Sequence, residues 1–238
     1  MNIKDPVRYA QQAVDACREL YGADLVSVTL YGSAAGGDFD PLRSDINLLI
    51  VLRSMDAGLI AKSALIWKKL RRRRFGIPLF MDKEYIAASV DSYPMEFMDM
   101  KERRVVLFGE DVLETISCEP EHLRLQIERE LKGKWLHLMQ GFILAHKNSA
   151  MIRNLAQLSL RDFTPIFRAL CTLRGEKPPT DRKSLSDKIE TLCSLEGKPL
   201  QGMRDGCVKG RLLNGDLVQR FIDYARAIKK IIDSIENQ

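Results

Sequence analysis

The stretch that decides the fold is LYGSAAGGDFDPLRSDINLLIVL, residues 30–52. Gly32 and Ser33 directly follow one apolar, β-rich run, and Asp45 directly precedes another. A glycine lets backbone amides approach a phosphate closely, and a serine hydroxyl can donate a hydrogen bond to it. The pattern therefore predicts two strands joined by a loop that is suited to binding a phosphate group.

A second feature of the same stretch is the pair Asp45 and Asn47. Alternate residues of a strand point to the same face, so these two side chains are expected to lie together. Two carboxylates at this spacing can hold two magnesium ions about 3.5–4 Å apart and clamp a transferring phosphoryl group. The spacing fits that chemistry, whereas Asn47 keeps one oxygen ligand and lacks the negative charge.

Length and composition indicate an ordinary globular protein. The 238 residues suffice for one large domain or two small ones, with 45% hydrophobic and 29% charged residues. No apolar run approaches the roughly 20 residues of a membrane span, and the N-terminal residues lack the apolar core of a secretory signal. Five scattered cysteines without a CxxC pair predict reduced thiols in a cytoplasmic protein, with neither a zinc site nor disulfides. The net charge of +5 permits an anionic partner without requiring one.

The chain changes character near residue 115. Before it, helical and β-rich patterns alternate, with strands expected at Leu25–Tyr31, Ile46–Leu52, Ile77–Met81 and Glu96–Phe108 and helices after Asp5, at 56–74 and near 84–90. After Pro120 the patterns are helical, at about 121–147, 150–174, 183–195 and 215–236. The expected fold class is α+β: an α/β domain with a mixed sheet over residues 1–115, followed by a bundle of about four helices over 116–238.

Residues 24–52 resemble the signature of the DNA polymerase beta-like nucleotidyltransferase superfamily, especially its minimal and aminoglycoside-type bacterial members. That signature is an apolar strand, a Gly-Ser pair, a loop, and then Asp-x-Asp in a second apolar strand. The residues that match it are Gly32, Ser33, Ala35, Gly37, Ser44, Asp45, Leu48 and Ile50. The resemblance is looser over residues 1–115, and the helical tail is similar in kind to the substrate-side bundle of these proteins.

The resemblance implies roles for particular residues. Gly32, Ser33 and Ser44 would hold the phosphates of a nucleoside triphosphate, and Asp45 would hold Mg²⁺. Members of the superfamily usually carry a third carboxylate on a later strand, for which this chain offers Asp82, Glu96 or Asp99. Strand alternation would place Glu96 and Asp99 on opposite faces, so that only one of them could join the site. For each of the three, the simpler interpretation is a solvated acid at a strand edge.

Two functions follow from the degenerate Asp-x-Asn motif. Asn47 predicts an impaired or lost two-metal site in a protein that binds a nucleotide or a partner. The alternative is an active Mg²⁺-dependent nucleotidyltransferase that moves an NMP group from an NTP to a hydroxyl of a small molecule or a protein. Either function is compatible with an oligomer. Nucleic acid is not an expected partner, because no aromatic residues interleave the basic run KKLRRRR, residues 68–74, which is predicted to lie solvated at a helix C-terminus.

Overall fold

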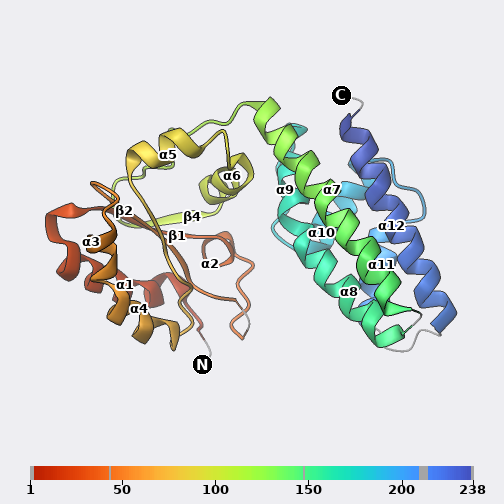
Figure 1. Ribbon diagram of the computed structural model, residues 1–238, viewed down its shortest axis with the longest axis horizontal. Helices are drawn as coiled ribbons and strands as arrows, with labels where there is room; N and C mark the ends of the chain where they lie inside the picture. Colours follow the sequence, from red (N-terminus) through yellow and green to blue (C-terminus); the bar gives the residue numbers. More distant parts are fainter. Residues whose placement is uncertain (1–2, 43, 147, 209–213, 237–238) are drawn as a thin grey trace. The chain divides into compact units, whose positions relative to one another are not determined.

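A computed structural model describes residues 3–42, 44–146, 148–208 and 214–236 of the chain. It divides into two compact units, Met1–Cys118 and Glu119–Gln238. Figure 1 shows strands and helices in the first unit and helices in the second. Together they confirm the predicted α+β fold class, in which a mixed sheet is followed by many helices.

The N-terminal unit contains a mixed four-stranded sheet in the order β3-β2-β1-β4. Its strands are β1 Leu25–Tyr31, β2 Asn47–Leu52, β3 Leu79–Met81 and β4 Arg104–Gly109. β1 is antiparallel to β2 and to β4, whereas β2 and β3 are parallel. Because β1 and β2 are neighbours, the end of β1 and the start of β2 lie side by side, with Tyr31 opposite Asn47.

The helices of this unit follow local start and stop signals. They are α1 Pro6–Tyr21, the 3-10 turn Gly22–Asp24, α2 Ser33–Gly36, α3 Ala57–Ala61, α4 Ala64–Arg71, α5 Lys83–Ser89 and α6 Pro94–Glu102. As predicted, Asp5 caps α1 and Pro6 occupies its first turn. The single helix expected at 56–74 is two helices. α3 ends at Ala61, α4 begins at Ala64, and the hydroxyl of Ser63 donates to the Ile60 carbonyl at the break.

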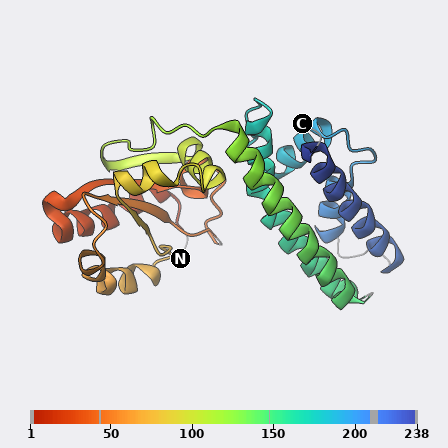
Figure 2. The same ribbon diagram turned by 45° about the horizontal axis from the view of Figure 1, so that its top comes forward.

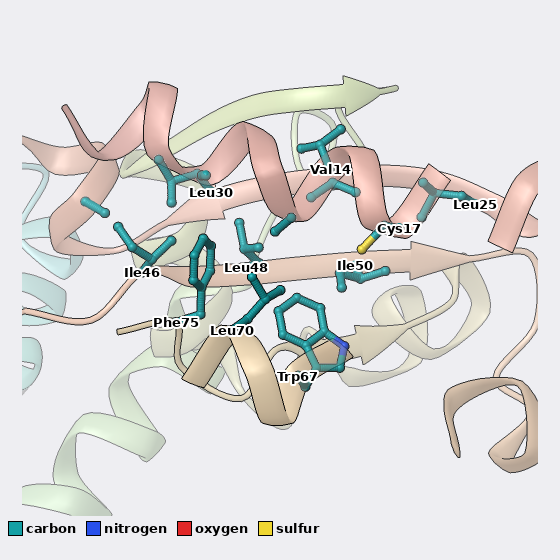
Figure 3. Close-up of a cluster of buried hydrophobic side chains, with 14 of the residues drawn as sticks. Val14, Cys17, Leu25, Leu30, Ile46, Leu48, Ile50, Trp67, Leu70 and Phe75 are labelled. Carbon is teal, nitrogen blue, oxygen red and sulfur yellow. The ribbon is translucent and has the colours of Figure 1, made fainter. Parts of the chain in front are cut away.

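Side-chain alternation along β2 separates two buried clusters, one on each face of the sheet. Ile46, Leu48 and Ile50 pack with side chains of α1 and α4, as Figure 3 shows. Leu49 and Val51 pack on the other face with Ile86 of α5 and Phe97 of α6. Asn47, at the start of β2, has the same parity as Leu49 and therefore belongs to the α5/α6 face.

The C-terminal unit is helical throughout its described residues. Its helices are α7 Pro120–Ala145, α8 Ser149–Asp162, α9 Thr164–Leu173, α10 Arg182–Leu192, α11 Pro199–Val208 and α12 Asn214–Glu236. α7 packs against α8, α9 and α12, and Figure 2 shows α7 as the long helix of this bundle. In the described part of the chain, no helix has the length and apolarity required to cross a membrane.

Two helix boundaries in this unit differ from the sequence expectation. The helix expected at 150–174 is divided into α8 and α9 at Phe163, where Thr164 and Pro165 begin a new first turn. Between the helices expected at 183–195 and 215–236 the structure has a further helix, α11, which Pro199 begins. Pro165 and Pro199 each occupy the first turn of a helix, where the backbone N–H has no partner within the helix and its absence breaks no hydrogen bond.

The five cysteines are free thiols, and four of them are buried. Burial raises the pKa of Cys17 to about 12 and that of Cys171 to about 11. Such thiols stay protonated near neutral pH and act as small apolar side chains of the core.

Candidate functional site

Backbone hydrogen bonds of Gly32 hold the Gly-Ser turn after β1, and they require a backbone conformation that favours glycine. Gly32 has φ 75° and ψ −145°, a conformation that is essentially restricted to glycine. Its amide donates to the Arg103 carbonyl over 3.0 Å, and its carbonyl accepts from Ala35 at 3.1 Å and from Gly36 at 2.9 Å. These bonds connect the turn to the chain entering β4 and start the short helix α2 at Ser33.

The turn leaves two amides without a partner. Among the described residues, no hydrogen bond uses the backbone N–H of Ser33 or of Ala34. The Ser33 side chain is half-buried and likewise accepts or donates no hydrogen bond to a described residue. Two amides and a hydroxyl at one turn form the kind of donor set that binds phosphate oxygens.

The side chain and the amide of Ser44 form hydrogen bonds within the loop that precedes β2. Its hydroxyl accepts a hydrogen bond from the Asp40 amide over 3.0 Å, and its own amide donates to the Asp40 carbonyl over 2.9 Å. The Arg74 guanidinium donates to the carbonyls of Pro41 and Ser44. The structure therefore gives Ser44 a part in closing this loop, in addition to the nucleotide contact that the resemblance implies.

Asp45 precedes β2 and Asn47 begins it, on either side of the buried Ile46, so strand alternation predicts that their side chains share a face. Asp45 is exposed and Asn47 is half-buried. Neither side chain forms a hydrogen bond or ion pair with a described residue. The Asn47 carboxamide lies between two glycines: a Cβ atom on Gly32 would be 3.6 Å from Asn47 Nδ2, and one on Gly76 would be 2.7 Å from Asn47 Oδ1. Asn47 is thus placed directly beside the Gly-Ser turn.

The strands on either side of this pair contribute no carboxylate beside it. Ile46 pairs in parallel with Phe75, and Leu49 pairs with Leu79, so residues 76–78 run alongside Asn47 and Leu48. These three residues are glycine, isoleucine and proline. On the far side of β1, the residue opposite Tyr31 is Arg104. The neighbours of Asp45 and Asn47 in the sheet are therefore apolar or basic.

Glu96 and Asp99 lie on a helix, so the predicted strand Glu96–Phe108 is wrong over its first half. Pro94 opens α6, which runs to Glu102, and only Arg104–Gly109 forms a strand. The argument from strand alternation therefore fails, because residues three apart on a helix share a side. Glu96 is exposed in the first turn of α6, and Asp99 forms an ion pair with Arg103 at 3.6 Å.

Asp82 lies at the opposite end of the sheet from Asn47. It follows β3, whose last residue Met81 pairs with Val51, four residues or roughly 13 Å along β2 from Asn47. Its carboxylate caps α5 by accepting from the Tyr85 amide at 2.7 Å, and it also accepts from the Met55 amide at 2.9 Å. These backbone hydrogen bonds hold the pKa of Asp82 below its usual value. The structure does not bring Asp82 to Asp45.

An ion-pair cluster that the sequence did not indicate lies beside the Gly-Ser turn. The Arg103 guanidinium pairs with Asp38 and, at 3.6 Å, with Asp99, and it lies so close to Gly36 that a Cβ there would overlap it. Arg104 pairs with Asp111, its Nη2 lying 2.6 Å from Asp111 Oδ2. Arg103 and Asp38 are 65 residues apart, so no local pattern could have connected them.

Asp45 and Asn47 offer oxygen ligands of the kind that Mg²⁺ prefers. Asp45 supplies a carboxylate and Asn47 a neutral oxygen, and Mg²⁺ is commonly held by one or two carboxylates together with phosphate oxygens. Within the described residues, no three His, Cys, Asp or Glu side chains gather closely enough to hold a metal. Asp45 and Asn47 would together hold one Mg²⁺, with further ligands supplied by the phosphates of a nucleotide.

Comparisons with known proteins concern the sequence of the N-terminal unit and the fold of the chain. Residues 10–109, which lie within the N-terminal unit, match the family described as nucleotidyltransferase domain. No curated protein matches the chain in sequence. Among solved structures, the chain resembles that of spectinomycin adenyltransferase AAD(9) from Enterococcus faecialis, crystallised with ATP and spectinomycin. The match has a TM-score of 0.57 at 9% identity and covers 93% of this chain and 98% of that one. At this identity the likeness shows a shared fold.

The family match lies within the N-terminal unit, whereas the likeness in fold extends over most of the chain. The family match over residues 10–109 and the shared fold together support the predicted resemblance to the DNA polymerase beta-like nucleotidyltransferase superfamily. Fold alone does not fix activity, because the chemistry depends on the residues at the site.

Proposed function

We propose that this protein binds a nucleotide, or a partner, at the Gly-Ser end of its sheet and transfers nucleotidyl groups poorly or not at all. The observation that carries the proposal is the position of Asn47. Its carboxamide lies beside Gly32 of the Gly-Ser turn, in the place that the superfamily gives to its second aspartate. The protein therefore presents a neutral amide where two-metal catalysis needs a charge.

Electrostatics explains why this single change matters. Two divalent cations about 3.5–4 Å apart repel strongly, and bridging carboxylates offset that repulsion. With Asp45 alone, and with Gly76, Ile77 and Arg104 as the neighbours in the sheet, the site offers little compensation for a second ion. A nucleotide can still bring phosphate oxygens for one Mg²⁺, while the amides of Ser33 and Ala34 donate to the phosphates. Binding thus survives where turnover is impaired.

The alternative is an active Mg²⁺-dependent nucleotidyltransferase. It is favoured by Asp45, which is exposed and has no partner among the described residues, as a metal ligand requires. It is also favoured by the fold shared with an adenyltransferase that was crystallised with ATP and spectinomycin. In this case the chain would move an NMP group to a hydroxyl of a small molecule or a protein, and a carboxylate from outside the neighbouring strands would complete the metal site.

A thermal-shift experiment combined with a transfer assay tests the proposal. Each of the four ribonucleoside triphosphates with Mg²⁺ is added to wild type, Ser33→Ala and Asn47→Asp. We expect one or more nucleotides to raise the melting temperature of wild type, since a ligand of the folded state at 100 times its Kd stabilises by about 2.7 kcal/mol. Ser33→Ala should reduce that shift, and Asn47→Asp should lower the Mg²⁺ concentration needed for it, because a second carboxylate is restored.

The transfer assay separates the two functions. Labelled nucleotide with Mg²⁺ or Mn²⁺ should yield little pyrophosphate and no labelled product from wild type. Robust wild-type turnover would overturn the impaired-site proposal in favour of the active enzyme. No thermal shift with any nucleotide at millimolar concentration would instead contradict nucleotide binding and leave the partner-binding form of the proposal.

A further inference from the structure

The positive charge of this chain is concentrated in one segment of the N-terminal unit. Residues 53–82 contain eight Lys or Arg and two Asp, a net charge of +6, whereas the whole chain carries +5. The remaining residues therefore sum to about −1 by the same count. Because this segment carries more positive charge than the whole protein, the positive electrostatic potential is concentrated around it.

This segment encloses a groove of about 680 Å³ beside the sheet. An apolar floor and a basic rim line it, formed by Trp67, Pro78, Phe80, Lys68, Arg71 and Arg72. The groove lies between the helices α3 and α4 and the chain that enters β3. Its volume falls in the range of ordinary ligand sites, which are also mainly apolar with a few charged groups.

The basic rim has no partner within the described part of the chain. Lys68, Lys69, Arg71 and Arg72 are exposed and form no ion pair or hydrogen bond through their side chains with described residues. The two acids of the segment are used elsewhere, since Asp56 caps α3 and Asp82 caps α5.

The helix dipole does not require so many cations. α4 has only eight residues, and Lys68 repels Arg71 and Arg72 at the i+3 and i+4 positions. Like-charge pairs at this spacing cost a few tenths of a kcal/mol each. A cluster that is unpaired and mutually repulsive is stabilised by an anionic ligand.

The groove also borders an unpaired strand edge. β3 is the end strand of the sheet, so one side of its backbone has no neighbouring strand among the described residues. Ile77, just before β3, lines the groove with 71% of its surface exposed. An edge of this kind can accept an extended peptide as an additional strand, with side-chain pockets beside it that select the sequence.

We propose that this groove binds an extended acidic segment of a partner protein, whose carboxylates pair with Lys68, Arg71 and Arg72 while its apolar side chains contact Ile77 and Phe80. Single-stranded nucleic acid fits less well, because the Trp67 ring is only 7% exposed and cannot stack on bases. A bilayer fits less well, because the free edge of β3 offers backbone hydrogen bonds that an extended peptide can form and a lipid chain cannot. The surrounding Lys and Arg also keep two copies of this edge from pairing with each other.

Binding of labelled peptides tests the proposal. The probes are fluorescent peptides of roughly eight residues that alternate Glu with Ile, Leu, Val or Phe, with Lys-containing counterparts as controls. Fluorescence anisotropy should show that glutamate peptides bind wild type and that lysine peptides do not. Raising the salt from about 50 to about 300 mM should weaken binding severalfold, because the pairs on the rim are screened.

Charge-reversal variants locate the binding surface. Lys68→Glu/Arg72→Glu should weaken peptide binding at least about tenfold, and Ile77→Ala severalfold. The matched control is Lys177→Glu/Lys183→Glu, which makes the same charge change at exposed lysines of the C-terminal unit and should leave binding unchanged. All of these side chains are exposed, so circular dichroism should show retained folding.

Three results would overturn the proposal. One is the absence of binding by any glutamate peptide. Another is equal binding to wild type and Lys68→Glu/Arg72→Glu. The third is binding of polyuridylate, or of phosphatidylserine vesicles, that is lost in Lys68→Glu/Arg72→Glu while the peptides do not bind, which would assign the groove to nucleic acid or to a membrane.

Discussion

The two ends of the N-terminal sheet each carry an aspartate next to a strand, and the structure uses the two carboxylates differently. Asp82, after β3, accepts two backbone amides and holds α5 and Met55 in place. Asp45, before β2, has no partner among the described residues. In the sequence both are acids at a strand boundary.

The difference shows how a structural acid is distinguished from a candidate ligand. A carboxylate that satisfies nearby N–H groups contributes to folding, since those donors would otherwise lack partners. A carboxylate that accepts no such hydrogen bonds, and that lies near a turn with unpaired amides, is available to bind a metal ion or an ion held by phosphate. We therefore expect substitutions at the Asp82 end to affect stability and substitutions at the Gly-Ser end to affect ligand binding.

The largest expected effect is on stability at the Asp82 end, from Gly109→Ala. Gly109 has φ 77° and lies opposite Ser27, and a Cβ there would overlap the carbonyl oxygen of Val26. Backbone cannot move aside as a side chain can, so we expect a loss of about 3 kcal/mol in the free energy of unfolding. Urea denaturation measures it.

Gly32→Ala at the Gly-Ser end is the matched control. Gly32 also has a positive φ, but the nearest atom to its Cβ would be Asn47 Nδ2 at an ordinary 3.6 Å. Only the backbone strain remains, so the expected loss is roughly 1–2 kcal/mol. Equal losses in the two variants would contradict the contrast between a tightly packed end and an open one.

The next two substitutions separate an effect on stability from an effect on ligand binding. Asp82→Ala removes a helix cap and should lower the melting temperature of the ligand-free protein by a few degrees, without changing the shift caused by Mg²⁺ and nucleotide. Asp45→Ala should leave the ligand-free melting temperature nearly unchanged and abolish the Mg²⁺-dependent part of that shift. Differential scanning fluorimetry with and without Mg²⁺ measures both. The reverse pattern would show that the metal site is at the Asp82 end.

The features that could be predicted from the sequence are those that depend on residues close together in the chain. The apolar, β-rich runs and the Gly-Ser pair between them predicted β1, β2 and the turn that follows β1, because these signals are local. The stretch PMEFMDMK, residues 94–101, was misassigned because its apolar residues suit a buried strand and a buried helix alike. The proline at its start was the available signal for a helix.

Contacts between distant residues could not be predicted. The Arg103–Asp38 pair, the closeness of Gly76 to Asn47 and the groove beside β3 all depend on how the strands are ordered. That order places residue 75 beside residue 46 and residue 104 beside residue 31. The local hydrophobic periodicity of a sequence does not indicate which strands become neighbours in the sheet.

The smallest expected effect concerns the charges already paired at the Gly-Ser end. Arg104 donates from Nε to both oxygens of Asp111 at 2.9 Å, and this hydrogen bonding holds the pKa of Asp111 below its usual value. A lowered pKa in the folded state means that the pair stabilises fully above the ordinary Asp pKa of about 3.9 and that this contribution is lost as the pH falls through the lowered value.

Asp111→Asn should therefore lower the free energy of unfolding by about 1 kcal/mol at pH 7, and the difference from wild type should shrink below about pH 4. Urea midpoints of both proteins from neutral to acidic pH measure it. Glu110→Gln is the control, because the Glu110–Lys83 pair is half exposed or more on both sides and should contribute little. A difference that persists unchanged at acidic pH would show that Asp111 acts through its shape and not its charge.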